Sequence, residues 1–406
     1  MLYSLYEAQH AALEPLRLVA EFSRGWFGHP FSPLTHLPGS RRVSAGSDLF
    51  LRMTQRYEKP AWTIDETTID GERVPVSIEV AQELPVCRLI HFRRELSAPR
   101  NDPKVLVVAP LSGHHATLLL DTVRRLLPEH EVWVTDWIDA RMVPLAQGPF
   151  HLDDYVDYVR GFIRLLSPEL HIISVCQPTV PVLAAVALMA DADEPYVPKT
   201  MVMMGGPIDP RKSPTTVNNL ATKKPYSWFE QHLIHRVPAK YPGFMRQVYP
   251  GFLQHMGFVG MNPDRHMNAH WDYYNHLLEG DGDSAEGHRR FYDEYNAVLD
   301  MPAEYYLDTI KTVFQDFALP QGRWRVRDAL VRPQAITKTA LLTIEGELDD
   351  ISGNGQTEAA HPLCLNIPAE RREHYVAPKV GHYGIFSGRR WREMIYPRVR
   401  EFIRKA

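Results

Sequence analysis

The sequence is poor in cysteine and contains no long apolar run. Its 406 residues include three cysteines, Cys87, Cys176 and Cys364, and no C-x-x-C pair. An odd number of cysteines without that spacing argues against both a disulfide framework and a structural zinc site. No stretch approaches the ~18 consecutive apolar residues that a membrane-spanning helix requires, so we expect no membrane span.

Positive charge is also not in excess. The formal net charge is −4, which argues against the global basic field of proteins that bind nucleic acids or anionic membranes. The initial segment, MLYSLYEAQHAALEPLRLVAEF, lacks the basic and then long apolar regions of a secretory signal peptide. We therefore expect a cytoplasmic protein that does not bind nucleic acid.

Apolar residues are abundant enough for a large core. Hydrophobic residues make up 44% of the chain and charged residues 23%, which is ordinary for a soluble globular protein. The 33 prolines exceed the typical share of ~5%, and many fall in the middle of the chain. Because proline interrupts helices, this region is expected to be an irregular insertion rather than a set of long unbroken helices.

Short apolar runs alternate with amphipathic segments in two parts of the chain. Val105–Ala109 is continuously apolar, as in a strand buried on both faces of a parallel sheet, and Leu152–Leu166 has helical periodicity. This alternation predicts a doubly wound, mostly parallel α/β sheet. The other expected strands are Val74–Val80, Pro85–Phe92, Glu131–Thr135, His171–Val175, Thr200–Met204, Ala340–Ile344 and Arg372–Pro378, and the other expected helices are Leu2–Phe22, Ser47–Tyr57, Thr117–Leu127, Val180–Met189 and Gly388–Arg404.

The alternation stops between residues 211 and 335. This region is rich in aromatic residues and histidine, and prolines break its helical pieces. We interpret it as a mainly helical cap inserted into one α/β core that is formed by residues 61–210 and 336–406. Residues 1–60 are interpreted as an N-terminal helical segment.

Cys176 lies at a junction where a buried strand ends and a helix begins, in the segment HIISVCQPTVP. A strand–turn–helix junction of this kind exposes the nucleophile in the α/β-hydrolase fold. The position at a helix N-terminus favours thiolate over thiol. No G-x-S-x-G string occurs in the chain, so Cys176 is the candidate nucleophile; the alternative is a buried structural cysteine.

An acid and a histidine follow Cys176 in the order that this fold uses. Asp349 comes three residues after Gly346 at the end of a late strand, where the acid that orients the imidazole is expected; Asp350 is the alternative. His382 lies between glycines in VGHYG after the last strand and suits a general base. The order nucleophile, acid, base therefore predicts a triad of these residues and Cys176.

Acyl transfer also requires an oxyanion hole. The fold builds it from the backbone N–H of the residue after the nucleophile, here Gln177, and from an N–H in the loop after an early strand. The loop APLSGHH has that position, and we expect the backbone of Leu111 or Ser112 to contribute. His114 and His115 are expected to shape the loop or to pack at the mouth of the pocket.

Several motifs together resemble the intracellular polyhydroxybutyrate depolymerases, over nearly the whole chain. They are SVCQP, APLSGHHATLL, VTDW, MMGGPID, EGELDDISG and VGHYGIFSGRRW. The resemblance implies an α/β-hydrolase in which Cys176 is the nucleophile, Asp349 the acid and His382 the base. It also implies a cytoplasmic enzyme at the surface of polyhydroxyalkanoate granules, with amorphous short-chain poly(3-hydroxybutyrate) as its substrate.

The expected reaction proceeds through a hydroxyacyl thioester on Cys176. Water or coenzyme A then accepts the acyl group. No other cofactor is expected, and the sequence leaves the oligomeric state open, including a homo-oligomer. Three alternatives remain: a polyhydroxyalkanoate synthase, whose nucleophile box is similar to G-x-C-x-G-G, a non-catalytic granule-binding protein, and a cysteine hydrolase of small esters.

Aromatic residues of the cap, such as Trp228, Tyr241 and Trp271, are candidates for gripping an apolar chain, although most cap aromatics are expected to form the cap's own core. His266 and His270 are four residues apart, a spacing that helical metal ligands can have. Without H-E-x-x-H or an obvious third ligand, no metal site is expected.

Overall fold

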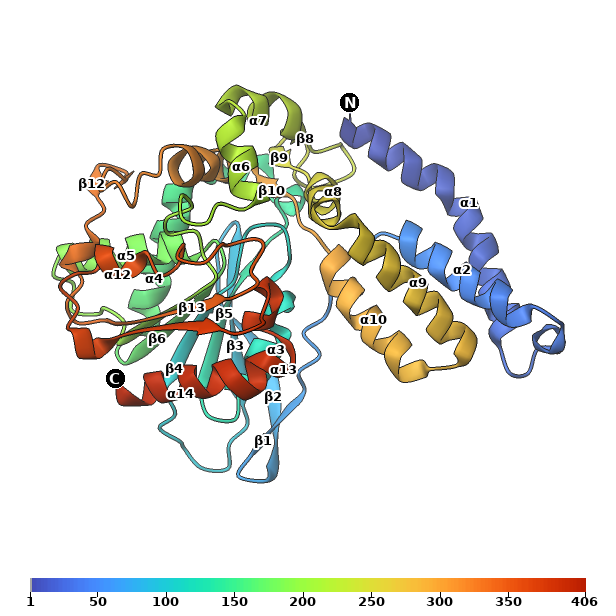
Figure 1. The fold of residues 1–406 in the computed structure, drawn as a ribbon, viewed down its shortest axis with the longest axis horizontal. Helices are drawn as coiled ribbons and strands as arrows, with labels where there is room; N and C mark the ends of the chain where they lie inside the picture. The colour runs from blue at the N-terminus through green and yellow to red at the C-terminus, as the bar shows by residue number, and fades with distance from the viewer. Residues whose placement is uncertain (1) are drawn as a thin grey trace.

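A nine-stranded sheet forms the centre of the molecule in the computed structural model, which describes residues 2–406 (Figure 1). The strand order is β1-β2-β3-β5-β4-β6-β7-β13-β14. The first three strands pair antiparallel, and those from β5 to β14 pair in parallel. The strands are β1 Glu66–Ile69, β2 Glu72–Glu83, β3 Cys87–Arg94, β4 Lys104–Val108, β5 Glu131–Trp137, β6 Leu170–Val175, β7 Thr200–Met204, β13 Ala340–Gly346 and β14 Arg372–Ala377.

Helices surround this sheet, so the predicted α/β-hydrolase-type fold class is confirmed. α3 and α14 lie together, because the Arg125 guanidinium sits 4.7 Å from the centre of the Tyr396 ring. α4 packs on α5 and on α11. The bounds are α3 Leu120–Leu126, α4 Leu152–Leu166, α5 Thr179–Asp191, α11 Ala303–Thr309, α12 Ala360–Leu363, α13 Gly388–Arg390 and α14 Tyr396–Lys405.

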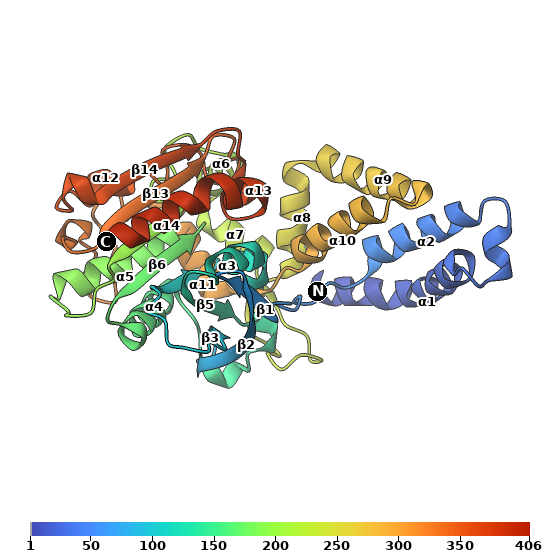
Figure 2. The same cartoon turned by 90° about the horizontal axis from the view of Figure 1, so that it is seen from below.

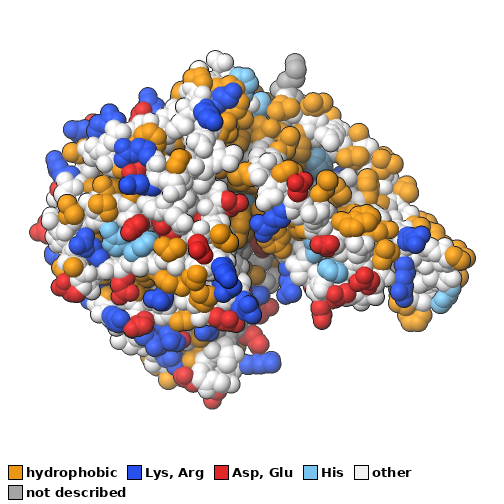
Figure 3. Space-filling model, viewed as in Figure 1, with side chains coloured by type: hydrophobic (Ala, Val, Ile, Leu, Met, Phe, Trp, Pro, Cys, Tyr) orange, Lys and Arg blue, Asp and Glu red, His pale blue; other side chains and the backbone are white. Residues whose placement is uncertain are grey.

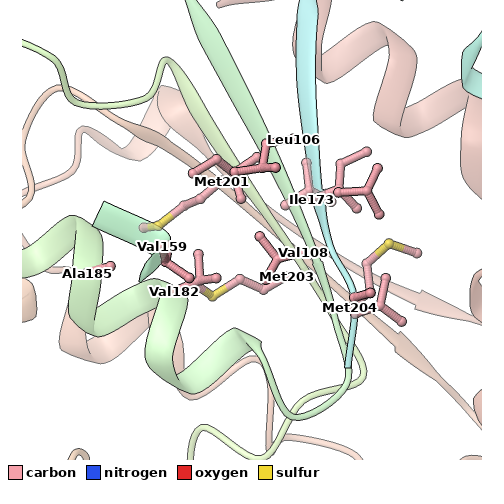
Figure 4. Close-up of a cluster of buried hydrophobic side chains, with 14 of the residues drawn as sticks. Leu106, Val108, Val159, Ile173, Val182, Ala185, Met201, Met203 and Met204 are labelled. Carbon is pink, nitrogen blue, oxygen red and sulfur yellow. The ribbon is translucent and has the colours of Figure 1, made fainter. Parts of the chain in front are cut away.

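The middle strands are buried along their whole length, as their continuous apolar runs predict. Every residue of β6 and β7 is buried. Figure 4 shows Met201 and Met203 of β7 beside Val182 and Ala185 of α5, a helix that is apolar nearly all round. The sheet with its two helical layers therefore forms a rigid frame under the carboxyl ends of the strands.

The structure corrects several expected boundaries. α2 begins at Ser40 rather than Ser47, and the short strand β1 was missed because four alternating residues carry little periodic signal. The expected helix Thr117–Leu127 is a 3₁₀ turn followed by α3. The expected helix Gly388–Arg404 is interrupted by a π-helical turn, Trp391–Ile395, just before a proline that cannot donate a backbone hydrogen bond.

Four helices form a lobe beside the sheet domain, which we call the helical lobe: α1 Leu2–Gly28, α2 Ser40–Thr54, α9 Pro263–Glu279 and α10 Gly282–Asn296. Figures 1 and 2 both show it projecting to one side. α1 packs on α2, α2 on α9 and α9 on α10, so the N-terminal helices join part of the inserted segment. The division of the chain at residues 60, 210 and 335 stays a prediction.

The rest of the inserted segment covers the sheet domain above the strand ends (Figure 1). Its helices are α6 Thr216–Lys223, α7 Tyr226–Leu233 and α8 Gly251–Met261, together with α11. Its short strands are β8 His235–Arg236, β9 Gln247–Tyr249, β10 Met301–Pro302, β11 Arg325–Val326 and β12 Ala329–Leu330. Among residues 2–406, no helix combines the length and the apolarity that crossing a membrane would take.

Candidate active site

Cys176 occupies the turn between β6 and α5, as the sequence predicts. Its backbone φ is 67°, a left-handed conformation that costs a non-glycine residue free energy and turns the chain sharply. The Cys176 N–H donates to the Met204 carbonyl at 2.7 Å, which ties the turn to the end of β7. The half-buried thiol thus lies between the end of β6 and the start of α5.

Two consecutive glycines at the end of β7 leave room for this turn. A Cβ on Gly206 would lie 1.8 Å from the Thr179 hydroxyl and 2.5 Å from the Cys176 carbonyl oxygen. Gly205, with φ +58°, would place a Cβ 3.3 Å from both the Asp349 carboxylate and the His382 ring. In the sequence this pair stands within the motif MMGGPID, and a glycine doublet at a strand end is a signal of close backbone approach.

Asp349 and His382 form a buried pair. His382 Nδ1 lies 2.7 Å from Asp349 Oδ2, and the side chains are 5% and 0% exposed. The other carboxylate oxygen of Asp349 accepts the N–H groups of Ile351 at 2.9 Å and Ser352 at 2.8 Å. The carboxylate is therefore fixed in orientation before any substrate arrives, whereas Asp350 is exposed.

The charge state of His382 follows from these neighbours. Burial opposes a charged imidazole, but the Asp349 carboxylate and the Cys176 sulfur outweigh it and hold the pKa of His382 well above its ordinary range. A side-chain hydrogen bond with Cys176 contributes to this rise. The His382 ring thus interacts with the Cys176 sulfur and with the Asp349 carboxylate, the contacts that a nucleophile–base–acid arrangement requires.

Cys176 and His382 open onto a cavity of about 400 Å³ beneath the inserted segment. Leu111, Ser112 and Gln177 line the same cavity. The Gln177 side chain accepts a hydrogen bond from the buried Tyr305 hydroxyl, a contact that the sequence did not predict. The structure therefore brings together every residue expected for the triad and the oxyanion hole, and their catalytic roles stay predictions.

His114 and His115 of the same loop are buried. The His114 ring stacks at 5.0 Å on Phe258 and its Nε2 lies 3.1 Å from the Tyr295 carbonyl oxygen. Burial lowers the pKa of His114 to about 4 and the pKa of His115 to about 3, so both rings are neutral near pH 7. The first lines the cavity and the second faces a separate cleft beside the helical lobe.

The structure does not bring the named cap aromatics into this cavity. Trp228 stacks on His232, Tyr241 accepts a hydrogen bond from Arg56, and Trp271 is 62% exposed on α9. Periodicity could not separate these rings from others of the same segment. The aromatic residues that line the cavity are Phe229, Tyr249, Phe258, Tyr305, Tyr306, Phe314, Tyr383 and Phe386.

The remaining candidate ligands and thiols are packed into the structure. Burial raises the pKa of the Cys87 thiol well above its ordinary range and that of Cys364 to about 12, so neither is a ready nucleophile. His266 lies 2.9 Å from the Tyr292 hydroxyl within the helical lobe. Across the described part of the chain, no three His, Cys, Asp or Glu side chains are grouped as a metal site.

Two comparisons relate the chain to known proteins, one with a protein-family model and one with solved structures. Residues 205–406 match the family model described as PHB de-polymerase C-terminus. No curated protein sequence matches the chain.

Solved structures of known hydrolases align with the chain at low sequence identity and with TM-scores below 0.5. A putative lipase from Acinetobacter baumannii is 11% identical over 82% of this chain and 93% of that chain, with a TM-score of 0.44. The 2-hydroxy-6-oxo-6-phenylhexa-2,4-dienoate hydrolase from Rhodococcus sp. strain RHA1 is 12% identical over 82% and 99%, with a TM-score of 0.43. A thermophilic esterase from Thermogutta terrifontis is 13% identical over 84% and 97%, with a TM-score of 0.41.

Proposed function

Because residues 205–406 match the family model described as PHB de-polymerase C-terminus, we propose that the chain is a carboxylic ester hydrolase that cleaves amorphous short-chain poly(3-hydroxybutyrate). One observation carries the proposal: Cys176 at the sharp turn after β6 shares a cavity with His382, whose ring is hydrogen-bonded to Asp349. This is the arrangement that nucleophilic acyl transfer requires.

In the proposed first step, the Cys176 thiolate attacks an ester carbonyl of the polymer. The charge on the carbonyl oxygen is stabilised by the backbone N–H of Gln177 and by an N–H of Leu111 or Ser112. The ester C–O bond then breaks, and the leaving alkoxide takes the proton from His382. The products of this step are a hydroxyacyl thioester on the enzyme and a shortened chain with a hydroxyl end.

The second step transfers the acyl group to an acceptor. Water, deprotonated by His382, gives a hydroxyacid or an oligomer, and coenzyme A gives a hydroxyacyl thioester of coenzyme A. Transfer of the acyl group from the Cys176 thioester to the thiol of coenzyme A converts one thioester into another, so its energy change is close to zero. This is our hypothesis for why the nucleophile is a cysteine. Coenzyme A is therefore proposed as an acceptor substrate rather than as a resident cofactor.

The partner that we propose is the apolar surface of a polyhydroxyalkanoate granule. α1 exposes several large apolar side chains, and Figure 3 shows hydrophobic side chains gathered over the helical lobe. Exposed apolar patches of this kind mark interaction sites more often than free surface. The large apolar residues exposed on α1 are Leu2, Leu5, Leu16, Leu18, Val19, Phe22 and Trp26.

The test is turnover of native amorphous poly(3-hydroxybutyrate) granules, with and without coenzyme A, by the wild type, Cys176→Ala and Cys364→Ala. We expect release by the wild type and by Cys364→Ala, because Cys364 is buried away from the cavity. Cys176→Ala should lose at least about 10³-fold of the rate. Equal release by both alanine variants would refute the cysteine mechanism, and polymer made from hydroxybutyryl-coenzyme A without release would favour a synthase.

A further inference from the structure

The walls of the catalytic cavity carry no charged side chain outside the triad. Among the residues that the structure describes, none of those lining the cavity is Lys, Arg, Asp or Glu. The polar groups present are amides, hydroxyls and the rings of His114 and His382. The cavity therefore offers hydrogen bonds to a neutral ligand but no cation to an anionic one.

The two histidines do not supply a free positive charge. Burial lowers the pKa of His114 to about 4, so this ring is neutral near pH 7. The His382 charge is held between the Asp349 carboxylate and the Cys176 sulfur. With the thiolate formed, the triad as a whole is negative and repels a second anion nearby.

The exposed residues that line the cavity are uncharged as well. Four of the lining residues are exposed: Thr216 and Leu220 on α6, and Gly257 and Gly260 on α8. Leu220 is 44% exposed. A substrate therefore reaches Cys176 between α6 and α8, two helices of the inserted segment, without passing a lining group that could pair with a carboxylate.

We infer that the cavity discriminates by charge, and that the enzyme cleaves internal esters in preference to the last ester before a free carboxylate. The inference rests on the proposed function. Internal segments of the polyester carry only neutral ester oxygens. A free-acid dimer would carry its carboxylate on the hydroxybutyrate unit that leaves, within the cavity, where an unpaired charge is strongly disfavoured.

The experiment compares the free-acid dimer of 3-hydroxybutyrate with its methyl ester, at a pH where the acid is ionised. Cleavage of the ester between the two units is measured by release of 3-hydroxybutyrate or its methyl ester. We expect kcat/KM to be at least about 30-fold higher for the neutral dimer. Cleavage of both dimers at rates within about threefold of each other would overturn the inference and leave the proposed function standing.

Two further outcomes separate the possibilities. Cleavage of neither dimer by protein that degrades granules would mean that chain length, not charge, decides, and would also overturn the inference. If the protein cleaved neither the dimers nor the granules, the proposed function would be contradicted, and the inference with it.

A variant pair tests the same inference by gain of function. Leu220→Lys adds a cation at the mouth, and Leu220→Met adds a neutral side chain of similar reach, at an exposed position where either should fold. The ratio of kcat/KM for the free acid to that for the methyl ester should rise at least about fivefold in Leu220→Lys relative to Leu220→Met. An unchanged ratio would contradict the inference.

Discussion

At the scale of single residues, the site depends on backbone space as much as on functional groups. Cys176 holds a left-handed conformation that the end of β7 must accommodate, and the two glycines there provide the room. Gly205 lies beside the Asp349–His382 pair, and Gly206 beside the turn. The position of the thiol relative to the imidazole therefore depends on Gly205 and Gly206 having no side chain.

Gly206→Ala should damage the site through packing alone. The added Cβ meets the Thr179 hydroxyl and the Cys176 carbonyl oxygen, so the turn has to shift. We expect a loss of about 1–3 kcal/mol in the free energy of unfolding and at least about a tenfold loss in kcat. Calorimetry and ester turnover measure the two effects.

Gly161→Ala is the matched control, because a Cβ at this helical position in α4 meets nothing within 4 Å. This variant should keep full activity, and its free energy of unfolding should rise by about 0.5–1 kcal/mol. Equal activity of both variants would contradict the account of the turn.

Asp349→Asn should reduce turnover by on the order of 100-fold or more. The amide keeps the shape of the carboxylate, and its oxygen can still accept from Ile351 and Ser352. It then presents an N–H to His382 Nδ1, which favours the wrong tautomer and removes the charge that stabilises the imidazolium. Asp350→Asn, at an exposed position, should stay within about twofold of the wild type. Comparable losses in both variants would contradict this assignment of the acid.

At the scale of elements, the sequence predicted the sheet domain well. The parallel strands are buried on both faces and read as uninterrupted apolar runs, so β7 and α4 have the expected bounds. The antiparallel edge was less visible because β1 is four residues long. The π-helical turn before α14 was invisible because a single proline does not indicate how far upstream the hydrogen bonding changes.

The candidate site could be predicted in part. The residues predicted for the triad and the oxyanion hole lie close to strand ends, where the topology of the fold brings them together, so order and spacing predicted their positions, while their roles stay predictions. The cavity wall comes from the inserted segment, whose contacts join residues far apart in sequence. The hydrogen bond between Tyr305 and Gln177, 128 residues apart, is one such contact and has no local signature.

The contact between α1 and the inserted segment also joins distant residues. The Tyr3 hydroxyl at the start of α1 donates to Asp300 Oδ2 at 2.9 Å, and the same carboxylate accepts the Gly251 N–H at 2.8 Å. Tyr3→Phe should therefore cost about 1–3 kcal/mol in the free energy of unfolding, because it leaves a buried acceptor without its partner. Urea denaturation measures the change.

Tyr6→Phe provides the comparison. Tyr6 stacks on Phe252 with ring centres 4.2 Å apart, a contact that phenylalanine keeps, so the cost should stay below about 0.5 kcal/mol. A Tyr3→Phe variant as stable as Tyr6→Phe would contradict the role given to this hydrogen bond.

At the scale of the whole molecule, buried histidines make stability depend on pH. Burial lowers the pKa values of His115 to about 3 and of His114, His130 and His171 to about 4. Below pH ~6.5 the unfolded chain binds protons at these positions, whereas the folded chain does not. The free energy of unfolding therefore decreases as pH falls from ~6.5 toward 4. Burial raises the pKa of Glu294 to about 7, which opposes this trend over the same range.

His130 isolates one part of this dependence. Its Nδ1 lies 3.1 Å from the Leu126 carbonyl oxygen, and its ring is fully buried beside Tyr396, away from the catalytic cavity. Between pH 7 and 5, His130→Gln should lose about 2 kcal/mol less unfolding free energy than the wild type. Exposed His36, changed to Gln, should leave the pH slope unchanged. The unfolding free energy is measured by denaturation at each pH. If it changed with pH in His130→Gln as steeply as in the wild type, the prediction would be contradicted.

Whether Cys176 carries the acyl group is measured by mass spectrometry of the protein quenched in acid during turnover of an activated 3-hydroxybutyrate ester. The account predicts an added mass of one hydroxybutyryl group on the peptide that contains Cys176, removed by hydroxylamine and absent from Cys176→Ala. An acyl group on any other residue, or none during active turnover, would contradict it.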